Sequence, residues 1–478
     1  MGEEIRSSQF YRQDYSDFYR KLENETLTLK RLLEHNAFGK SQALCGIEQE
    51  AWITNQHYYP APENQFLLDE IASDLLSPEL AQFNIELNVH PQQIAGRGLR
   101  IMHDELSALW KKCERKLQEK NHKLLMVGIL PTVRDQELVV ENMSRMNRYQ
   151  ALNEQVLKQR KGRPLSLNIV GVEHLKSEHR DVMLESAATS YQIHRQIPAE
   201  QGARYYNASI IISAPMVALC ANSPFLFGRA LWDETRIPLF EQAVEAGGYG
   251  DAAHGPIRRV TFGTAYVQQS IFELFQENLD HYPVLLPVPL NDKDDSLPYL
   301  RMHNGTIWRW NRPLLGVNEA GEPHIRIEHR VISAGPTIVD EIANTAFFLG
   351  LQEFYANQKD ALESSLVFSD AKHNFYNAAQ HGLNAKIKWL DGKKQPILHL
   401  LATELLANAK QGLKMLAMDN NDIRDYLAVI EARLAKRQTG AEWQKNYVKK
   451  HACHMNQLAE KYWELQKFGQ PVHDWTLE

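Results

Sequence analysis

The chain has 478 residues, of which 44% are hydrophobic and 23% are charged, and its formal net charge at pH 7 is −6. This composition is typical of globular proteins, and the length allows a large core, in one domain with a helical appendage or in two or three domains. The negative charge excludes a general attraction to nucleic acid, and no apolar run reaches the roughly 18 residues of a membrane helix.

The cysteines and the N-terminal residues predict a cytoplasmic protein. Cys45, Cys113, Cys220 and Cys453 are scattered, and no C-x-x-C pair occurs among them. We interpret them as reduced thiols and expect neither disulfides nor a zinc site. The polar N-terminal stretch lacks the apolar core of a secretion signal.

The first strong pattern in the chain is a strand that carries two carboxylates. Residues 8–36 have apolar side chains at helical spacing and predict one or two helices, and residues 43–53, ALCGIEQEAWI, then predict a strand. Side chains on a strand alternate between faces, so Glu48 and Glu50 point the same way, within about 7 Å of each other. A shared divalent cation, Mg²⁺ or Mn²⁺, would relieve their repulsion. For an isolated E-x-E pair, a solvated strand face is the more common explanation.

Helices and strands alternate in the prediction for the rest of the chain. In order, the patterns predict a helix at 67–76, a strand at 83–91, a helix at 97–121, a strand at 124–130, a helix at 149–159, strands at 164–172 and 185–197, and a helix at 199–220. A polar loop leads into a helix at 228–245, glycine-rich residues 247–256 predict a mobile loop, and residues 284–298 predict another loop. Residues 300–311 and 324–331 predict an antiparallel pair joined by a turn at 318–321, and helices follow from residue 334 to the end.

Several predicted strands carry ionisable side chains on one polar face. These are Glu48 and Glu50 on the first strand, Glu86 at 83–91, His194 at 185–197, and Glu328 between Arg326 and Arg330 at 324–331. For the glutamates of the first two strands and for His194, a solvated strand face is the more common explanation, and for Glu328 with its two arginines a ladder of salt bridges is about as likely as a site. A curved antiparallel sheet would gather all seven side chains on one concave surface. Several carboxylates and one imidazole are typical ligands of Mg²⁺ or Mn²⁺ bound together with phosphates. Arginine is a common partner of phosphate groups. These seven side chains together therefore predict phosphoryl transfer.

A series of motifs in the same order resembles the glutamate–cysteine ligase family, in its bacterial carboxylate–amine ligase branch. The motifs are GIEQE, FNIELN, GILPT, NMSRMNRY, TSYQIH, ALCANSPFLFGR, WDETRI, HNGTIWRWNRP, RIEHRVISAGPT, NFYNAAQHGLNAKIKWLDG and TGAEWQ, and they cover roughly residues 40–445. The resemblance implies an α+β fold like that of glutamine synthetase: a curved, mainly antiparallel sheet with helices packed on its outer face. It also implies that ATP activates a carboxylate as an acyl phosphate, which an amine then converts to an amide.

The resemblance also assigns roles to particular residues. It implies that the metal ligands are Glu48, Glu50, Glu86, His194 and Glu328, for Mg²⁺ or Mn²⁺ bound with ATP. It implies that Arg326, Arg330 and Arg236 act on phosphate or substrate, and that Gln192, Arg309 and Arg326 contact the nucleotide. Related sequences often have histidine at the position of Gln192, and arginine at the position of Gln380, so the number of metals and the substrate specificity are open here.

The domain division and three functional hypotheses complete the prediction. We expect an N-terminal helical segment at 1–40, a catalytic domain at 41–390 and a C-terminal helical region at 391–478, in a cytoplasmic protein that binds neither nucleic acid nor membrane and that forms a possible homo-oligomer. The first hypothesis is an ATP-dependent ligase with glutamate and cysteine as the default substrates. The alternatives are a catalytically silent relative that binds a nucleotide or metabolite, for which Gln192 is the only support, and a metal-dependent hydrolase, which would not need ATP.

Overall fold

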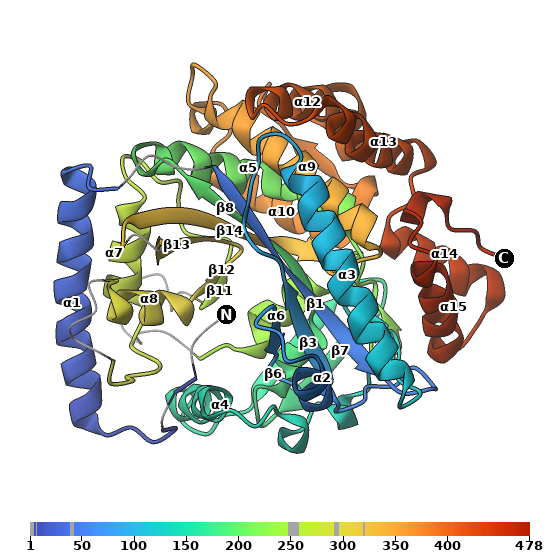
Figure 1. Ribbon diagram of the computed structural model, residues 1–478, viewed down its shortest axis with the longest axis horizontal. Helices are drawn as coiled ribbons and strands as arrows, with labels where there is room; N and C mark the ends of the chain where they lie inside the picture. The colour runs from blue at the N-terminus through green and yellow to red at the C-terminus, as the bar shows by residue number, and fades with distance from the viewer. Residues whose placement is uncertain (1–3, 6, 39–42, 247–257, 291–295, 319–320) are drawn as a thin grey trace.

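An eight-stranded antiparallel sheet runs through the middle of the protein (Figure 1). The computed structural model describes residues 4–5, 7–38, 43–246, 258–290, 296–318 and 321–478. The main strand order is β13-β14-β8-β1-β3-β2, and β4 and β5 also pair with β1. These strands are β1 (Leu44–Thr54), β2 (Leu76–Pro78), β3 (Asn84–Asn88), β4 (Gln92–Gln93), β5 (Lys123–Leu125), β8 (Ser190–Ile197), β13 (Asn311–Val317) and β14 (Pro323–Ser333).

Helices cover one face of this sheet, and the alternation of side chains explains why. Cys45, Ile47 and Ile53 of β1 are buried in the same apolar core as α3 (Gly98–Gln118), α5 (Gly202–Cys220) and α9 (Ile338–Ala356). Tyr191 of β8 also points to this face, where its hydroxyl lies 2.7 Å from Thr345 Oγ1 of α9. The side chains one position along each strand therefore point to the opposite face, which carries the polar residues. The predicted fold class, a curved, mainly antiparallel sheet with helices on its outer face, is confirmed.

The remaining elements surround the sheet. The helices are α1 (Arg12–Glu34), α2 (Asn64–Ile71), α4 (Asn147–Gln159), α6 (Arg236–Ala243), α7 (Phe272–His281), α8 (Pro298–Gly305), α10 (Phe368–His381), α11 (Ile397–Leu400), α12 (Leu406–Met415), α13 (Asn420–Lys436), α14 (Gly440–His451) and α15 (Met455–Lys467). The short strands are β6 (Leu165–Val170), β7 (His174–His179), β9 (Phe225–Leu226), β10 (Arg229–Ala230), β11 (Val260–Thr261), β12 (Trp308–Arg309), β15 (Lys386–Lys388) and β16 (Lys394–Pro396). Among the described residues, no helix is both long enough and apolar enough to cross a membrane.

Most predicted elements are confirmed, but four segments differ, one of which is the antiparallel pair of β15 and β16 inside the predicted run of helices after residue 334. Residues 300–311 were predicted as a strand, whereas α8 occupies 298–305 and the strand that pairs with β14 is β13. Pro298 takes the first position of α8, where its fixed φ favours a helix and its missing N–H costs nothing. Only residues 124 and 125 of the predicted strand at 124–130 pair in the sheet, as part of β5, and residues 183–187 form a 3₁₀ helix before β8. The predicted loop at 247–256 lies outside the described residues.

The C-terminal helices pack onto the rest of the chain at several points. Helices α12 and α13 contact α9, and Tyr462 of α15 donates a hydrogen bond to the carbonyl of Met126 at 2.9 Å. The division into segments at residues 40 and 390 stays a prediction. The four cysteines are separate free thiols.

Candidate functional site

The first group of predicted ligands meets where β1, β8 and β14 lie side by side. Glu328 of β14 is directly opposite His194 of β8, and Glu48 of β1 lies on the same polar face. Nε2 of His194 is 3.0 Å from Oε1 of Glu48 and 3.7 Å from Oε1 of Glu328. We call these three residues the first triad. Oε2 of Glu48 is buried and has no hydrogen-bond partner among the described residues.

Two arginines surround the carboxylate of Glu328. Arg312 of β13 lies directly opposite it in the ladder and donates two hydrogen bonds, at 2.8 and 2.9 Å. Arg330 adds an ion pair at 3.2 Å. Burial alone raises the pKa of Glu328, but the two guanidinium groups outweigh it and hold the pKa well below its usual range. Glu328 is therefore ionised and firmly oriented.

A second group of carboxylates lies where β1 meets β3. Glu50 is directly opposite Glu86, and ligand oxygens of Glu50, Glu79 and Glu86 lie within 4.8 Å of one another. We call these the second triad. Burial raises the pKa of all three carboxyls, and neighbouring carboxylates raise it further, most strongly for Glu79. Neither Glu50 nor Glu79 forms an ion pair with a described lysine or arginine. Arg330 partly offsets the charge of Glu50, and the raised pKa values mean that the three carboxyls hold protons more readily than carboxyls in water.

Gln192 connects the two triads. Its side-chain Nε2 donates to Oε1 of Glu50 at 2.8 Å, and its Oε1 accepts a hydrogen bond from Nη1 of Arg330 at 2.6 Å. Arg330 in turn contacts Glu328. A neutral amide fits this position, because its NH₂ group donates to the carboxylate of Glu50 and its oxygen accepts from the guanidinium of Arg330.

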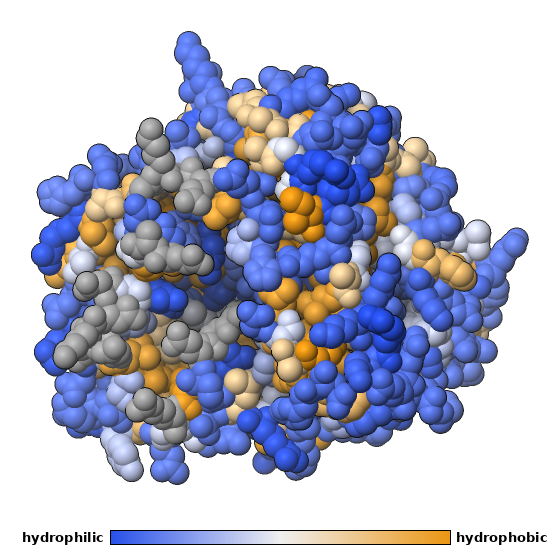
Figure 2. Space-filling view, in the orientation of Figure 1, coloured by the Kyte–Doolittle hydropathy of each residue, from blue (hydrophilic) through white to orange (hydrophobic). Residues whose placement is uncertain are grey.

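The other predicted arginines occupy three different environments. Arg326 lies on β14 two residues from Glu328, and its guanidinium forms no hydrogen bond or ion pair with any described residue. Arg236 is buried and pairs with Glu234 at 3.2 Å. Arg309 is bound to Glu277 and Asn278 of α7, and its nucleotide contact stays a prediction. Figure 2 shows a hollow lined by hydrophilic side chains in the region where Figure 1 draws β12 to β14.

A loop before α4 holds the segment that carries Glu79. Ser144 accepts a hydrogen bond from Asn64 Nδ2 at 2.9 Å and donates to the carbonyl of Glu79 at 2.5 Å. Its backbone N–H donates to the carbonyl of Leu80 at 2.8 Å. Tyr149 donates to the carbonyl of Pro78 at 2.9 Å. The NMSRMNRY motif thus fixes the backbone on both sides of Glu79.

The residues present fit a site for hard divalent cations. The two triads together offer five carboxylates and one imidazole, with ligand atoms of each triad within 4.8 Å of one another. This oxygen-rich set matches Mg²⁺ or Mn²⁺, and thiols are absent from both triads. A cation would bind Oε2 of Glu48, which has no hydrogen-bond partner among the described residues, and would relieve the repulsion among the three carboxyls of the second triad.

Three residues of this region were not predicted from the sequence. Glu79 follows the three-residue strand β2, which is too short to show alternation. Arg312 lies one residue beyond the predicted strand at 300–311, and the correct register would have placed it opposite Glu328. Glu185 lies in the 3₁₀ helix before β8, and burial together with Glu50 raises its pKa to about 8.

Comparisons with known proteins add to this geometry. The model of a family described as glutamate-cysteine ligase family 2, GCS2, matches residues 44–462. The structure is similar to glutamate–cysteine ligase of Francisella tularensis in complex with AMP, with 12% identity, a TM-score of 0.57, and 92% of this chain and 91% of that chain covered. It is also similar to a bifunctional glutathione synthetase of Pasteurella multocida, with 10% identity, a TM-score of 0.50, and 92% and 55% of the two chains covered. At such identities the structural similarities show the fold alone. No curated protein sequence matches the chain.

Proposed function

The chain belongs to glutamate-cysteine ligase family 2, and from this premise we propose that it is an ATP-dependent carboxylate–amine ligase. The observation that carries the proposal is the pair of triads on one sheet face, with Arg326 and Arg330 beside them. The sequence resemblance to the family is confirmed by the match over residues 44–462. We keep glutamate and cysteine as the default substrates and the cytoplasm as the expected location.

The proposed reaction has two steps. A carboxylate oxygen of the acid attacks the γ-phosphorus of ATP, the bond to the β-phosphate oxygen breaks, and an acyl phosphate and ADP form. The amine then attacks the acyl carbon, loses a proton and expels phosphate, which leaves an amide. The first step brings two anions together, so the site must supply positive charge around the phosphates.

The protein's own residues suit this requirement. Arg326 forms no hydrogen bond or ion pair with a described residue, although Glu48 and Glu328 attract it at longer range, so it can bind an anionic phosphate or carboxylate without breaking an ion pair. The buried Nε–H of Arg330 has no hydrogen-bond partner in the part of the chain that the structure describes. Glu48, His194 and Glu328 would hold one divalent cation, and Glu50, Glu79 and Glu86 another. Such cations would offset the charge of the ATP phosphates.

The proposal is tested by phosphate release from Mg-ATP over a grid of acids and amines, with EDTA as the metal-free control. We expect release only when an acid and an amine are both present, and loss of that release in Glu50→Gln and Glu328→Gln. Glu173→Gln is the matched control, because Glu173 is a carboxylate of the surface that pairs with Arg229. ATP binding without turnover for every pair would favour a silent relative, and turnover without ATP would favour a hydrolase.

A further inference from the structure

Arg330 lies in an irregularity of the sheet. The register between β14 and β8 shifts between His329 and Ile332, so that two residues of β14, Arg330 and Val331, lie opposite one residue of β8, Gln192. A β-bulge of this kind turns a side chain out of its regular direction, and such bulges are frequent next to active sites. The side chain of Arg330 accordingly reaches both Glu328 and Gln192.

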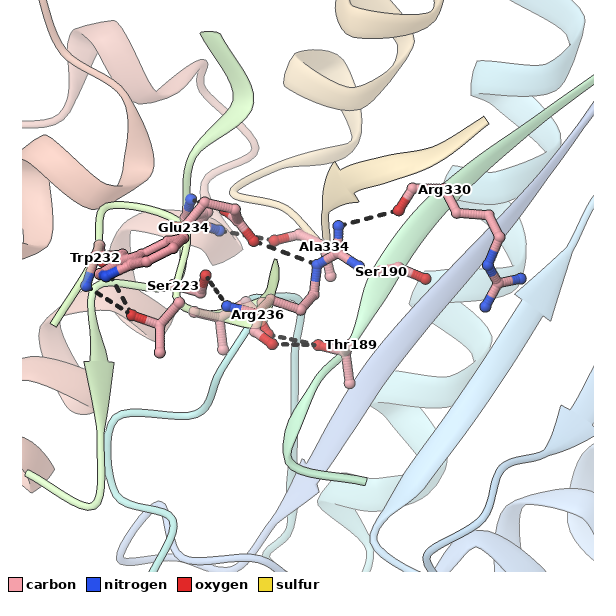
Figure 3. Close-up of polar contacts among 12 residues, drawn as sticks. Thr189, Ser190, Ser223, Trp232, Glu234, Arg236, Arg330 and Ala334 are labelled. Carbon is pink, nitrogen blue, oxygen red and sulfur yellow. Dashed lines mark hydrogen bonds and ion pairs between the residues drawn. The ribbon is translucent and has the colours of Figure 1, made fainter. Parts of the chain in front are cut away.

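On the other side of β14, the backbone carbonyl of Arg330 lacks its usual donor. The N–H of Arg330 donates to the carbonyl of Trp310 at 3.0 Å, as expected for the pairing of β14 with the chain before β13. In a regular ladder the N–H of Trp310 would return a hydrogen bond to Arg330, but it donates instead to Thr261 at 3.0 Å. Nη2 of Arg236 donates to the carbonyl of Arg330 at 3.0 Å and replaces the missing bond (Figure 3).

Arg236 itself is held on several sides. Its Nε donates to Oε1 of Glu234 at 3.2 Å, its backbone N–H donates to Ser223 Oγ at 3.2 Å, and its guanidinium lies 5.3 Å from the ring centre of Trp310. Glu234 is fixed in turn, because its Oε2 accepts a hydrogen bond from the backbone N–H of Asn222 at 2.9 Å. A buried guanidinium with these partners has one orientation.

We propose that Arg236 is a positioning residue for Arg330: it fixes the backbone at the β14 bulge by donating to the Arg330 carbonyl and thereby aims the Arg330 guanidinium at Glu328 and Gln192. This proposal rests on the proposed function and replaces the predicted contact of Arg236 with substrate. Of Arg236 and Arg330, only Arg330 would contact the anionic reactants. A buried backbone carbonyl that loses its one donor among the described residues is costly, so we expect the backbone at Arg330 to shift when Arg236 cannot donate.

A double-mutant cycle of Arg236→Met and Arg330→Met tests the proposal. We expect Arg236→Met to lower kcat at least tenfold, with a smaller change in KM for ATP, and Arg330→Met to lower kcat as much or more. If Arg236 acts through Arg330, the double variant matches Arg330→Met within about threefold, because the second change removes nothing further. Losses that multiply in the double variant would overturn the proposal.

Two further variants separate positioning from general stability. The guanidinium of Arg236 donates to both Glu234 and the Arg330 carbonyl, and the single ammonium of Arg236→Lys cannot reproduce both bonds in the same geometry. We therefore expect its activity to lie between those of wild type and Arg236→Met. Arg433→Met is the matched control, since Arg433 is also a buried arginine, paired with Asp340 at 2.8 Å on the helical side of the molecule. It should lower the melting temperature but leave kcat and KM unchanged. An equal fall of kcat in the control would also overturn the proposal.

A structural measurement distinguishes failure of this proposal from failure of the ligase assignment. In crystals of Arg236→Met, or of Arg236→Lys if the first variant does not fold, Nη1 of Arg330 should leave hydrogen-bond distance of Gln192 Oε1, which is 2.6 Å in the native protein. An unchanged Arg330 would overturn the positioning role even in an active ligase. A displaced Arg330 would support it even if the wild type joins none of the acids and amines tested.

Discussion

Replacing Glu79 by glutamine removes one of three mutually repelling carboxylates without changing the shape of the side chain. Ligand oxygens of Glu50, Glu79 and Glu86 lie within 4.8 Å of one another, and two unit charges at that distance repel by about 3.5 kcal/mol at an effective dielectric constant near 20. In the metal-free protein the pKa of Glu79 is raised well above its usual range by burial and neighbouring carboxylates, and its hydrogen bond to Glu86 requires a proton on one of the two carboxyls, so part of this repulsion is already relieved. We therefore expect metal-free Glu79→Gln to be more stable than wild type by about 1 kcal/mol.

The same change should weaken cation binding, because it removes a charged ligand. We expect the affinity for Mn²⁺ to fall by about tenfold or more. Thermal unfolding in EDTA measures the stability of the metal-free protein, and titration calorimetry measures the affinity for Mn²⁺. Glu173→Gln is the control in both measurements. A variant that is less stable in EDTA and binds Mn²⁺ as wild type does would refute the reasoning, since Glu79 would then be a structural residue.

Three further predictions concern other residues. Glu328→Gln leaves the guanidinium groups of Arg312 and Arg330 without their shared carboxylate, so it should destabilise the protein by about 3 kcal/mol in urea unfolding and abolish phosphate release. Arg326→Met removes no partner among the described residues, so it should raise KM for ATP at least tenfold while the melting temperature stays at the wild-type value. Burial lowers the pKa of His303 to about 4, against about 6.5 in the unfolded chain. Its unfolded form therefore gains a proton first, and stability that is complete above pH 6.5 is lost as the pH falls towards 4, by up to about 3 kcal/mol. His303→Gln should lose less stability than wild type between pH 7 and pH 5 in urea titrations.

The faces of the strands were predictable from the sequence because alternation is a local property. Glu48 and Glu50 do share the polar face of β1, as their spacing requires. They nevertheless belong to different triads, because Glu50 pairs with Glu86 of β3 whereas Glu48 lies near His194 of β8. Which strand lies on which side of β1 depends on contacts between distant parts of the chain, and a single-strand pattern does not contain that information.

The segment around α8 shows why other parts were not predictable. Ile307, Trp308 and Trp310 favour a strand by composition, but Pro298 starts a helix before them. Because the predicted strand stopped at residue 311, Arg312 fell outside it and its pairing with Glu328 was missed. Glu79 lies just after a three-residue strand, where no periodicity can be measured. Its place in the site depends on the hydrogen bonds that Ser144 makes to the surrounding backbone.

Transfer of an oxygen label tests the ligase function most directly. The acid is supplied with ¹⁸O in its carboxylate, together with Mg-ATP, an amine and the purified protein, and the released phosphate is examined by mass spectrometry. If an acyl phosphate forms and the amine displaces phosphate, one ¹⁸O atom of the acid appears in each phosphate released. Phosphate that carries no label from the acid but takes up ¹⁸O from labelled water would show that water attacks ATP, and it would contradict the proposal.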